Sequence, residues 1–176
     1  MKTHFQMMAG YNRWANARLY AAVAGLPDEV YRRDVGLFFG SVHRTLNHLV
    51  LTDLIWLRRI DGKGEDMGVA LDRVLYEDHR DLVAARLATD DRLGGFIDAI
   101  PEEGFADDFR YSNTAGVPFT QPLAQILAHL FNHQTHHRGQ THSGLSILGA
   151  APPSLDMIGF HRGIAAPSPE AMIGPA

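Results

Sequence analysis

The chain has 176 residues, of which 45% are hydrophobic and 20% are charged, as in an ordinary soluble globular protein. This length suits one well-buried core and is short for two. A formal net charge of −4 argues against a general nucleic-acid-binding protein, which would carry a basic surface for phosphates. The sequence has no apolar run of the roughly 18 residues that span a bilayer, and no secretory signal at its start. We therefore expect a cytoplasmic protein whose partners include neither nucleic acid nor a membrane.

The absence of cysteine excludes several kinds of site at once. A disulfide framework, a thiolate nucleophile, an iron–sulfur cluster and a cysteine-bound zinc all require this residue. If thiol chemistry takes place here, the thiol must belong to a substrate. Any bound metal must be held by histidine and carboxylate side chains.

Helical periodicity dominates the first half of the chain. Apolar residues at three- and four-residue steps predict a first helix over residues 3–24, which Gly25-Leu26-Pro27 ends. We expect residues 28–33 to add a short turn. A second helix is predicted from Ser41, a suitable N-cap, to about Ile60.

The second half predicts two further long helices. The third begins near Leu71 or Asp72 and ends near Pro101. Residues 105–119 form a turn-rich connector with the composition of a small hairpin. Thr120 and Pro122 suit the start of a fourth helix that runs to about Leu148.

Four long helices without a central strand predict an all-α fold, a four-helix bundle with a short turn-rich or hairpin connector before the last long helix. The helix topology stays open at this stage. We expect one domain over residues 1–164 and, because the end of the chain is rich in proline and glycine, a flexible tail over residues 165–176.

Five of the ten histidines lie between positions 129 and 142, within the predicted fourth helix. Neutral imidazole is the commonest ligand for divalent transition metals, and histidines four residues apart lie one helical turn apart. With about 100° of rotation per residue, His137 lies about 40° and His133 about 80° from the centre of the apolar stripe. His129 and His142 lie roughly 100–120° away, and His136 about 140°. His133 and His137 are therefore the candidate pair of ligands.

A lone histidine on a helix face is more often a hydrogen-bonded structural residue than a ligand, so the pair alone does not define a metal site. Zinc-type catalytic sites usually take three protein ligands and keep one position open. The third ligand must come from another helix, and periodicity leaves four candidates, His48, His43, His4 and His79.

Several other polar residues fall on predicted helical faces. Asp53 lies in the apolar stripe of the second helix and needs a buried partner. We expect it to bind a side chain of a neighbouring helix and, as the less favoured alternative, to support a metal ligand. Asn12 and Asn16 suit hydrogen bonds between helices. Arg138 suits a surface or interface salt bridge or, as an alternative, an anionic group of a substrate. We interpret three aromatic residues as core or dimer-interface side chains: Tyr11, Trp14 and Trp56.

Three segments resemble the DinB/YfiT-like family. They are Tyr11-Asn12-Arg13-Trp14-Ala15-Asn16, then Thr45-Leu46-Asn47-His48-Leu49 with Asp53 and Trp56, and finally residues 129–140, of sequence HLFNHQTHHRGQ. The resemblance covers about residues 5–160, and the last segment is its most specific part.

This resemblance implies a four-helix bundle, commonly dimeric, with a divalent metal on three histidines that map onto His48, His133 and His137. Among related members are thiol S-transferases with bacillithiol- or mycothiol-type cosubstrates, and others described as metal-dependent hydrolases. We therefore expect a metal-dependent transferase or hydrolase that acts on a small molecule, with a low-molecular-weight thiol as one candidate. Zinc and nickel suit three imidazoles best, with iron, manganese and cobalt as alternatives. The competing hypotheses are a non-catalytic metal-binding protein and a metal-free structural dimer.

Overall fold

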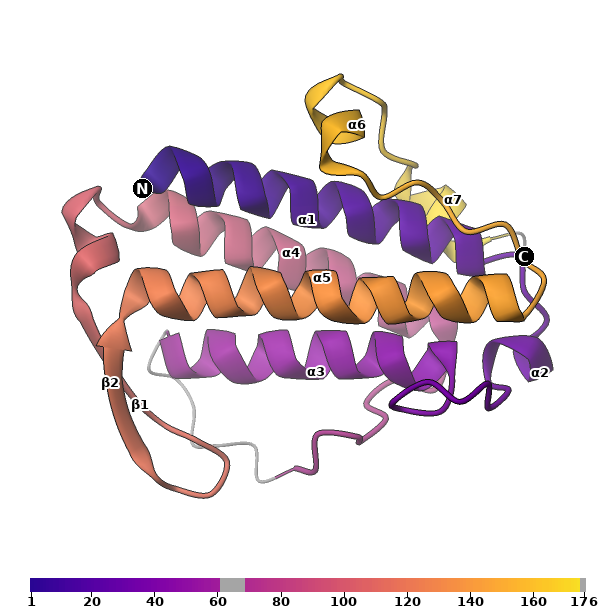
Figure 1. The fold of residues 1–176 in the computed structure, drawn as a ribbon, viewed down its shortest axis with the longest axis horizontal. Helices are drawn as coiled ribbons and strands as arrows, with labels where there is room; N and C mark the ends of the chain where they lie inside the picture. The colour runs from indigo at the N-terminus through magenta and orange to yellow at the C-terminus, as the bar shows by residue number, and fades with distance from the viewer. Residues whose placement is uncertain (61–68, 175–176) are drawn as a thin grey trace.

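The computed structural model describes residues 1–60 and 69–174, so most of the predicted loop over residues 61–70 lies outside the described residues. Four long helices pack together, which confirms the predicted fold class (Figure 1). They are α1 (Lys2–Val23), α3 (Val42–Ile60), α4 (His79–Ala99) and α5 (Leu123–Ile147). No helix in the described part of the chain is both long and apolar enough to cross a membrane.

The packing of the long helices gives the topology that the sequence left open. Helix α1 contacts α4 and α5, and helix α3 contacts the same two helices, so α1 and α3 lie diagonally opposite each other. Helices α1 and α5 run in one direction, and α3 and α4 run in the other (Figure 1). Helices α3 and α5 are therefore antiparallel neighbours, and side chains from both can meet between them.

Short elements complete the fold. The predicted hairpin is present, with β1 (Asp108–Ser112) antiparallel to β2 (Pro118–Pro122) directly before α5. The predicted turn after α1 is α2 (Asp28–Tyr31). The remaining short helices are η1 (Glu103–Ala106), α6 (Met157–His161) and α7 (Pro169–Ile173).

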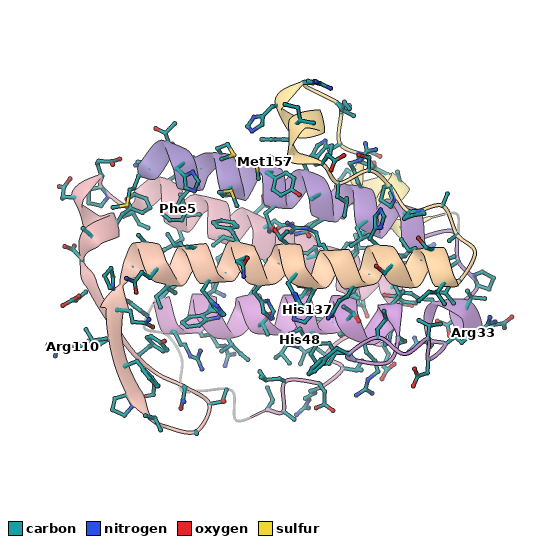
Figure 2. The ribbon with its side chains drawn as sticks, in the orientation of Figure 1. Phe5, Arg33, His48, Arg110, His137 and Met157 are labelled. Carbon is teal, nitrogen blue, oxygen red and sulfur yellow. The ribbon has the colours of Figure 1, made fainter. Side chains whose placement is uncertain are left out.

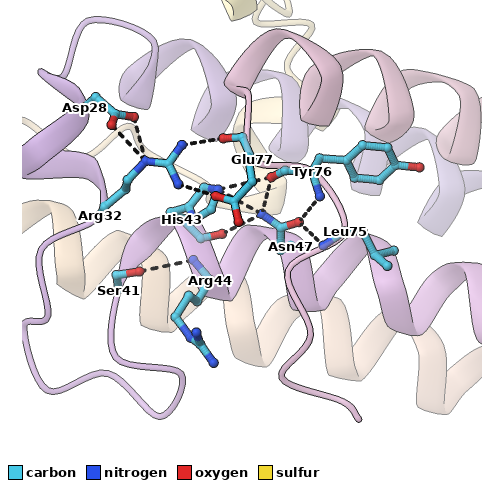
Figure 3. Close-up of polar contacts among 9 residues, drawn as sticks. All are labelled: Asp28, Arg32, Ser41, His43, Arg44, Asn47, Leu75, Tyr76 and Glu77. Carbon is cyan, nitrogen blue, oxygen red and sulfur yellow. Dashed lines mark hydrogen bonds and ion pairs between the residues drawn. The ribbon is translucent and has the colours of Figure 1, made fainter. Parts of the chain in front are cut away.

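Helix α4 begins later than predicted, at His79 instead of near Leu71. Asp78 is its N-cap, because its side chain accepts hydrogen bonds from the first backbone N–H groups of the helix. The segment before Asp78 stays non-helical because Asn47 of α3 holds it (Figure 3). The Asn47 Oδ1 accepts hydrogen bonds from the backbone N–H groups of Leu75 and Tyr76, both at 2.9 Å. These bonds take the donors that an earlier start of the helix would have used, and they fix the segment along α3.

His43, one turn before Asn47, joins the same contact and predicts a pH dependence of stability. Its Nε2 lies 3.1 Å from the Tyr76 carbonyl oxygen. Burial, followed by the positive charge of Arg32, lowers the pKa of His43 below its ordinary value of 6.5. Below that pH the unfolded chain takes up a proton that the folded protein does not. The free energy of unfolding of chelator-treated protein should therefore fall with falling pH, with at most about 1.4 kcal/mol per pH unit from this group.

The variant His43→Gln tests this dependence in urea titrations between pH 7 and 5. If the substitution only removes packing, the free energy of unfolding falls by the same amount at every pH. If it removes the titrating group, the free energy of unfolding of the variant depends less on pH than that of the wild type. Parallel curves for the two proteins would contradict the assignment.

The C-terminal segment differs from the flexible tail that we expected. Helix α7 packs against α1 and α4, and Met172 is only 1% exposed within the core cluster of that end of the bundle. The carbonyl oxygen of Met172 lies 2.9 Å from Nε2 of His79. One buried methionine in a proline-rich segment is too weak a signal to predict this docking.

The variant Met172→Ala should lower the free energy of unfolding by about 2–3 kcal/mol, because it leaves a cavity under α7. Ile164→Ala is a matched control, since Ile164 is 51% exposed in the same C-terminal region. Urea titrations compare the two, and equal losses would show that α7 does not stabilise the bundle.

The bundle core consists of two apolar clusters with a buried polar layer between them. One cluster surrounds Tyr20, Leu46 and Leu145, and the other surrounds Phe5, Phe105 and Phe131. The polar layer comes from all four long helices and is almost inaccessible to solvent; its members are Asn12, Asn16, Asp53, Arg86, Asp90, Gln134 and Arg138.

Ion pairs and amide hydrogen bonds connect the polar layer. Arg86 Nη2 lies 2.8 Å from an Asp53 oxygen and 3.0 Å from an Asp90 oxygen. Asn12 and Asn16 donate to Asp90 at 3.1 and 3.2 Å. The layer therefore joins α1, α3 and α4, which confirms the predicted inter-helix roles of both asparagines and of Asp53.

Helix α5 is fixed in rotation by two members of this layer. Gln134 donates to Asp53 at 2.6 Å. Arg138 donates to Asn12 and Asn16 and is itself 2% exposed. Each anchor directly follows one of the candidate ligands, His133 or His137. Because consecutive residues of a helix are about 100° apart, burying both anchors turns both histidines towards α3.

Candidate metal centre

Three histidines meet between α3 and α5. His48 comes from α3, and His133 and His137 come from α5; Figure 2 shows His48 and His137 beside each other between these helices. One ring nitrogen of each residue lies within 4.8 Å of those of the other two. His48 and His137 are buried, and His133 is half-buried. The structure therefore brings together the three residues that the sequence and the resemblance selected.

Hydrogen bonds direct one nitrogen of two of these rings away from the cluster. The Nδ1 of His48 lies 2.7 Å from the carbonyl oxygen of Leu71, and a carbonyl can only accept, so this nitrogen carries the proton. The Nδ1 of His137 lies 2.7 Å from the side-chain oxygen of Gln140, which likewise accepts. Both rings therefore keep the lone pair of Nε2 free, as a metal ligand requires.

The environment of the three rings favours their neutral form. Burial lowers the pKa of His48 to about 4, against the opposing effect of its hydrogen bond to Leu71. Burial, followed by repulsion from the neighbouring histidines, lowers the pKa of His133 to about 3. Burial also lowers the pKa of His137. At neutral pH the cluster consequently presents uncharged imidazoles, the form that binds metal.

The spacing of the rings fits a shared cation. The Nε2 atoms of His48 and His133 are 3.1 Å apart. Two nitrogens that each lie about 2.0–2.1 Å from one zinc-type ion are separated by about 2.9–3.4 Å, depending on the bond angle. In the metal-free protein the same distance suits a hydrogen bond from His133 to His48. The residues present therefore could hold a divalent ion without a change of fold.

Two cavities of different character adjoin the cluster. The first, which we call the Phe39 chamber, has a volume of about 550 Å³ and is lined by Phe38, Phe39, His48, Leu71, Asp72, His136 and His137. The second, the Trp56 chamber, has a volume of about 270 Å³ and is lined by Thr52, Ile55, Trp56, Arg59, Asn113, Thr114, His129 and His133, together with His48 and Leu71. The three-histidine cluster is thus open to small molecules from two directions.

Comparisons with known proteins assign the chain to a family. The model of the DinB family matches residues 1–170. The chain belongs to the DinB family. It is also similar to "Protein DinB" of Bacillus subtilis (strain 168), with 26% identity over 151 residues, which cover 83% of this chain and 87% of that protein.

The other candidate site residues of this DinB-family protein lie outside the three-histidine cluster. His43 and His79 contact backbone carbonyl oxygens away from the cluster, and His4 is exposed at the start of α1. His129 and His136 are exposed, as the helical geometry predicted. Neither expectation for Arg138 was correct: it is a buried member of the polar layer, where it cannot meet a substrate.

The aromatic residues divide between core and site. Tyr11 and Trp14 pack with Phe160 and donate hydrogen bonds to the carbonyl oxygens of Leu155 and Ile164, so both are core residues. Trp56 also packs against a core cluster, that of Phe5 and Phe131, and in addition it lines the Trp56 chamber, with the guanidinium of Arg59 4.8 Å from its ring centroid. The core packing of Trp56 was predicted, whereas its place in the wall of a cavity was not.

Sequence reasoning also missed the residues that position the cluster. Phe39 stacks on His48 with a centroid distance of 3.9 Å and an interplanar angle of 28°. Gln140 follows His137 by one helical turn, a spacing that could have identified it. Asn47 directly precedes His48 and holds the segment that supplies the Leu71 carbonyl, and a buried asparagine in an apolar helix was the available signal. The carbonyl of Leu71 itself has no sequence signal, because every residue has one.

Proposed function

We propose that this protein is a divalent-metal enzyme that transfers a group to, or hydrolyses, a small electrophilic molecule at the three-histidine cluster. The observation that carries the proposal is the convergence of three neutral imidazoles beside two cavities. A structural metal site is normally closed, whereas a catalytic one keeps a position for substrate. His48, His133 and His137 would hold the ion. When bound, the ion supplies Lewis acidity, which polarises an electrophile or lowers the pKa of a nucleophile such as water or a thiol.

The chain's own residues prepare this site in two ways. The Leu71 carbonyl and Gln140 hold the protons of His48 and His137 on Nδ1, so both rings present Nε2 without any proton transfer. The polar layer fixes the rotation of α5, so the cluster is formed before any ligand binds. Preorganisation of this kind avoids a conformational cost on binding.

We favour a low-molecular-weight thiol as one substrate. The chain has no cysteine, so a sulfur nucleophile must come from outside. The Trp56 chamber suits a polar cosubstrate, because residues with hydroxyl, amide and guanidinium groups line it. Zinc and nickel are the favoured ions, since both accept imidazole nitrogen readily. A non-catalytic metal-binding protein is the alternative.

Elemental analysis of untagged protein tests the proposal first. The expected result is about one divalent ion per chain, or uptake of one zinc or nickel ion on titration. A panel of low-molecular-weight thiols with electrophilic acceptors, and of activated esters and amides, then tests catalysis. Turnover should disappear on chelation and return with the ion. Metal binding without turnover on either panel would favour the non-catalytic alternative, and the absence of metal binding would refute both.

A further inference from the structure

The Phe39 chamber is bordered by large apolar side chains that the fold leaves uncovered. Phe38 is 78% exposed and Leu71 is 45% exposed. Both line the chamber, next to His48 and His137. Exposing an aromatic ring and a leucine in the wall of one cavity costs hydrophobic free energy, which a ligand that covers them would recover.

The exposed ring of Phe38 is held in place on both sides. Its neighbour Leu37 packs against α5 at Gly144, where an added Cβ would lie 2.9 Å from a Leu37 methyl carbon. Its other neighbour, Phe39, stacks on His48. Backbone hydrogen bonds from Gly40 to Leu37 and from Val35 to Gly40 close the turn around these residues. Phe38 therefore projects from a fixed turn, with its ring centroid 4.9 Å from that of Phe39 at 81°.

The charge of the chamber favours an uncharged ligand. Asp72 is the one carboxylate among its described lining residues, and it pairs with Arg44 at 3.3 Å. The other side chains at its wall are aromatic, imidazole or aliphatic. The Trp56 chamber differs, because hydroxyl, amide and guanidinium groups line it. The two sides of the cluster are therefore suited to chemically different molecules.

We propose that the Phe39 chamber binds an uncharged aromatic part of the substrate, and that Phe38 is the residue that determines this specificity. The inference rests on the proposed function in one respect, that the chamber serves the metal centre. Aromatic rings prefer edge-to-face or offset contacts with one another, and Phe38, Phe39 and His136 offer such contacts around one space. The volume of about 550 Å³ lies in the range of small-molecule pockets.

The probe for this inference is N-phenyl-1-naphthylamine, an uncharged aromatic dye whose fluorescence rises in apolar surroundings. It is titrated into the full-length protein after loading with zinc, and again after treatment with a chelator. Phe38→Ala should raise the dissociation constant about tenfold, because it removes both apolar area and a ring contact. The dissociation constant of Phe38→Leu should lie between those of the wild type and of Phe38→Ala. That of Phe38→Tyr should be within about twofold of the wild type. Phe38 is exposed, so these variants do not threaten folding.

Ile147→Ala is the matched control, since Ile147 is a large apolar residue of α5 that is 62% exposed and lines neither chamber. Its dissociation constant for the dye should equal that of the wild type. Three results would overturn the proposal: Phe38→Ala binds the dye as the wild type does, Ile147→Ala weakens binding equally, or Phe38→Ala changes the mass in solution. The last would show that a second copy of the chain covers Phe38.

Metal content and dye binding separate this inference from the proposed function. If the protein binds no metal but Phe38→Ala still weakens dye binding in the chelated protein, the aromatic site stands and the metal enzyme fails. If the protein binds metal and the Phe38 variants leave dye binding unchanged, the aromatic site fails and the metal centre stands. Nickel-loaded protein should also quench the bound dye relative to zinc-loaded protein, because the chamber adjoins the cluster. Equal fluorescence with both ions would contradict binding in this chamber.

Discussion

Replacing Arg86 by alanine is expected to lower the free energy of unfolding by about 3–5 kcal/mol, the range for breaking a buried ion pair from one side. Arg86 is fully buried and pairs with both Asp53 and Asp90. Its removal leaves two carboxylates inside the bundle with only amide and guanidinium donors of the layer around them. Desolvated charges without a partner are far more costly than the pair itself is worth.

Urea titration followed by circular dichroism measures this loss, with Arg13→Ala as the control. Arg13 pairs with Asp91 at the surface, where the two side chains are 49% and 67% exposed. Exposed ion pairs contribute about 0–1 kcal/mol. Asp53→Asn should give an intermediate loss, since it keeps the shape of the side chain but removes one charge of the layer. Similar losses for Arg86→Ala and Arg13→Ala would show that the polar layer does not stabilise the fold.

The polar layer also positions the three-histidine cluster, which gives its buried charges a role besides stability. Two of its members, Gln134 and Arg138, follow His133 and His137 in the chain, so their hydrogen bonds fix the face of α5 that those histidines occupy. Apolar contacts are not directional, whereas a hydrogen bond requires its donor and acceptor to face each other. Directional hydrogen bonds give the helix one register, and the geometry of the cluster follows from it.

The helices and the inward histidines could be predicted because they depend on local periodicity. Apolar residues recur at helical steps along α1, α3 and α5, and the structure places the ends of these helices within a few residues of the predicted positions. The rotation of a helix per residue is constant, so ranking His133 and His137 above His136 needed no tertiary information. The choice of His48 was different. It depended on the family resemblance, because α3 is buried around most of its surface and His48 does not lie at the centre of its apolar stripe.

What the sequence did not reveal depends on partners far away in the chain. The late start of α4 follows from the Asn47 side chain taking the N–H groups of Leu75 and Tyr76. The tautomer of His48 follows from the carbonyl of Leu71. Any backbone group can make such bonds, so composition and spacing do not identify the residue that does. Arg138 illustrates the same limit, since nothing in its local sequence distinguishes a buried arginine from one that binds a substrate.

Replacing His133 or His137 by alanine is expected to weaken zinc binding at least about 100-fold, more than the loss of a residue that only orients a ligand, which costs about 10–100-fold. Each variant leaves two imidazoles, too few for a tight zinc-type site. Dialysed wild-type protein should retain about one ion per chain, and either variant should retain almost none. His48→Ala should behave as these variants do, although it lies on another helix, because His48 belongs to the same three-histidine cluster.

Two further variants of α5 make this prediction specific. Gln140→Ala should weaken zinc binding about 10–100-fold, because it frees the Nδ1 of His137 without removing a ligand. His142→Ala should retain the ion, since His142 belongs to the same helix but not to the cluster. Inductively coupled plasma mass spectrometry gives the metal content, and circular dichroism shows whether each variant is folded. Folded His133→Ala protein that keeps its full complement of metal would place the ion elsewhere, and the chemistry proposed for this cluster would fail with it.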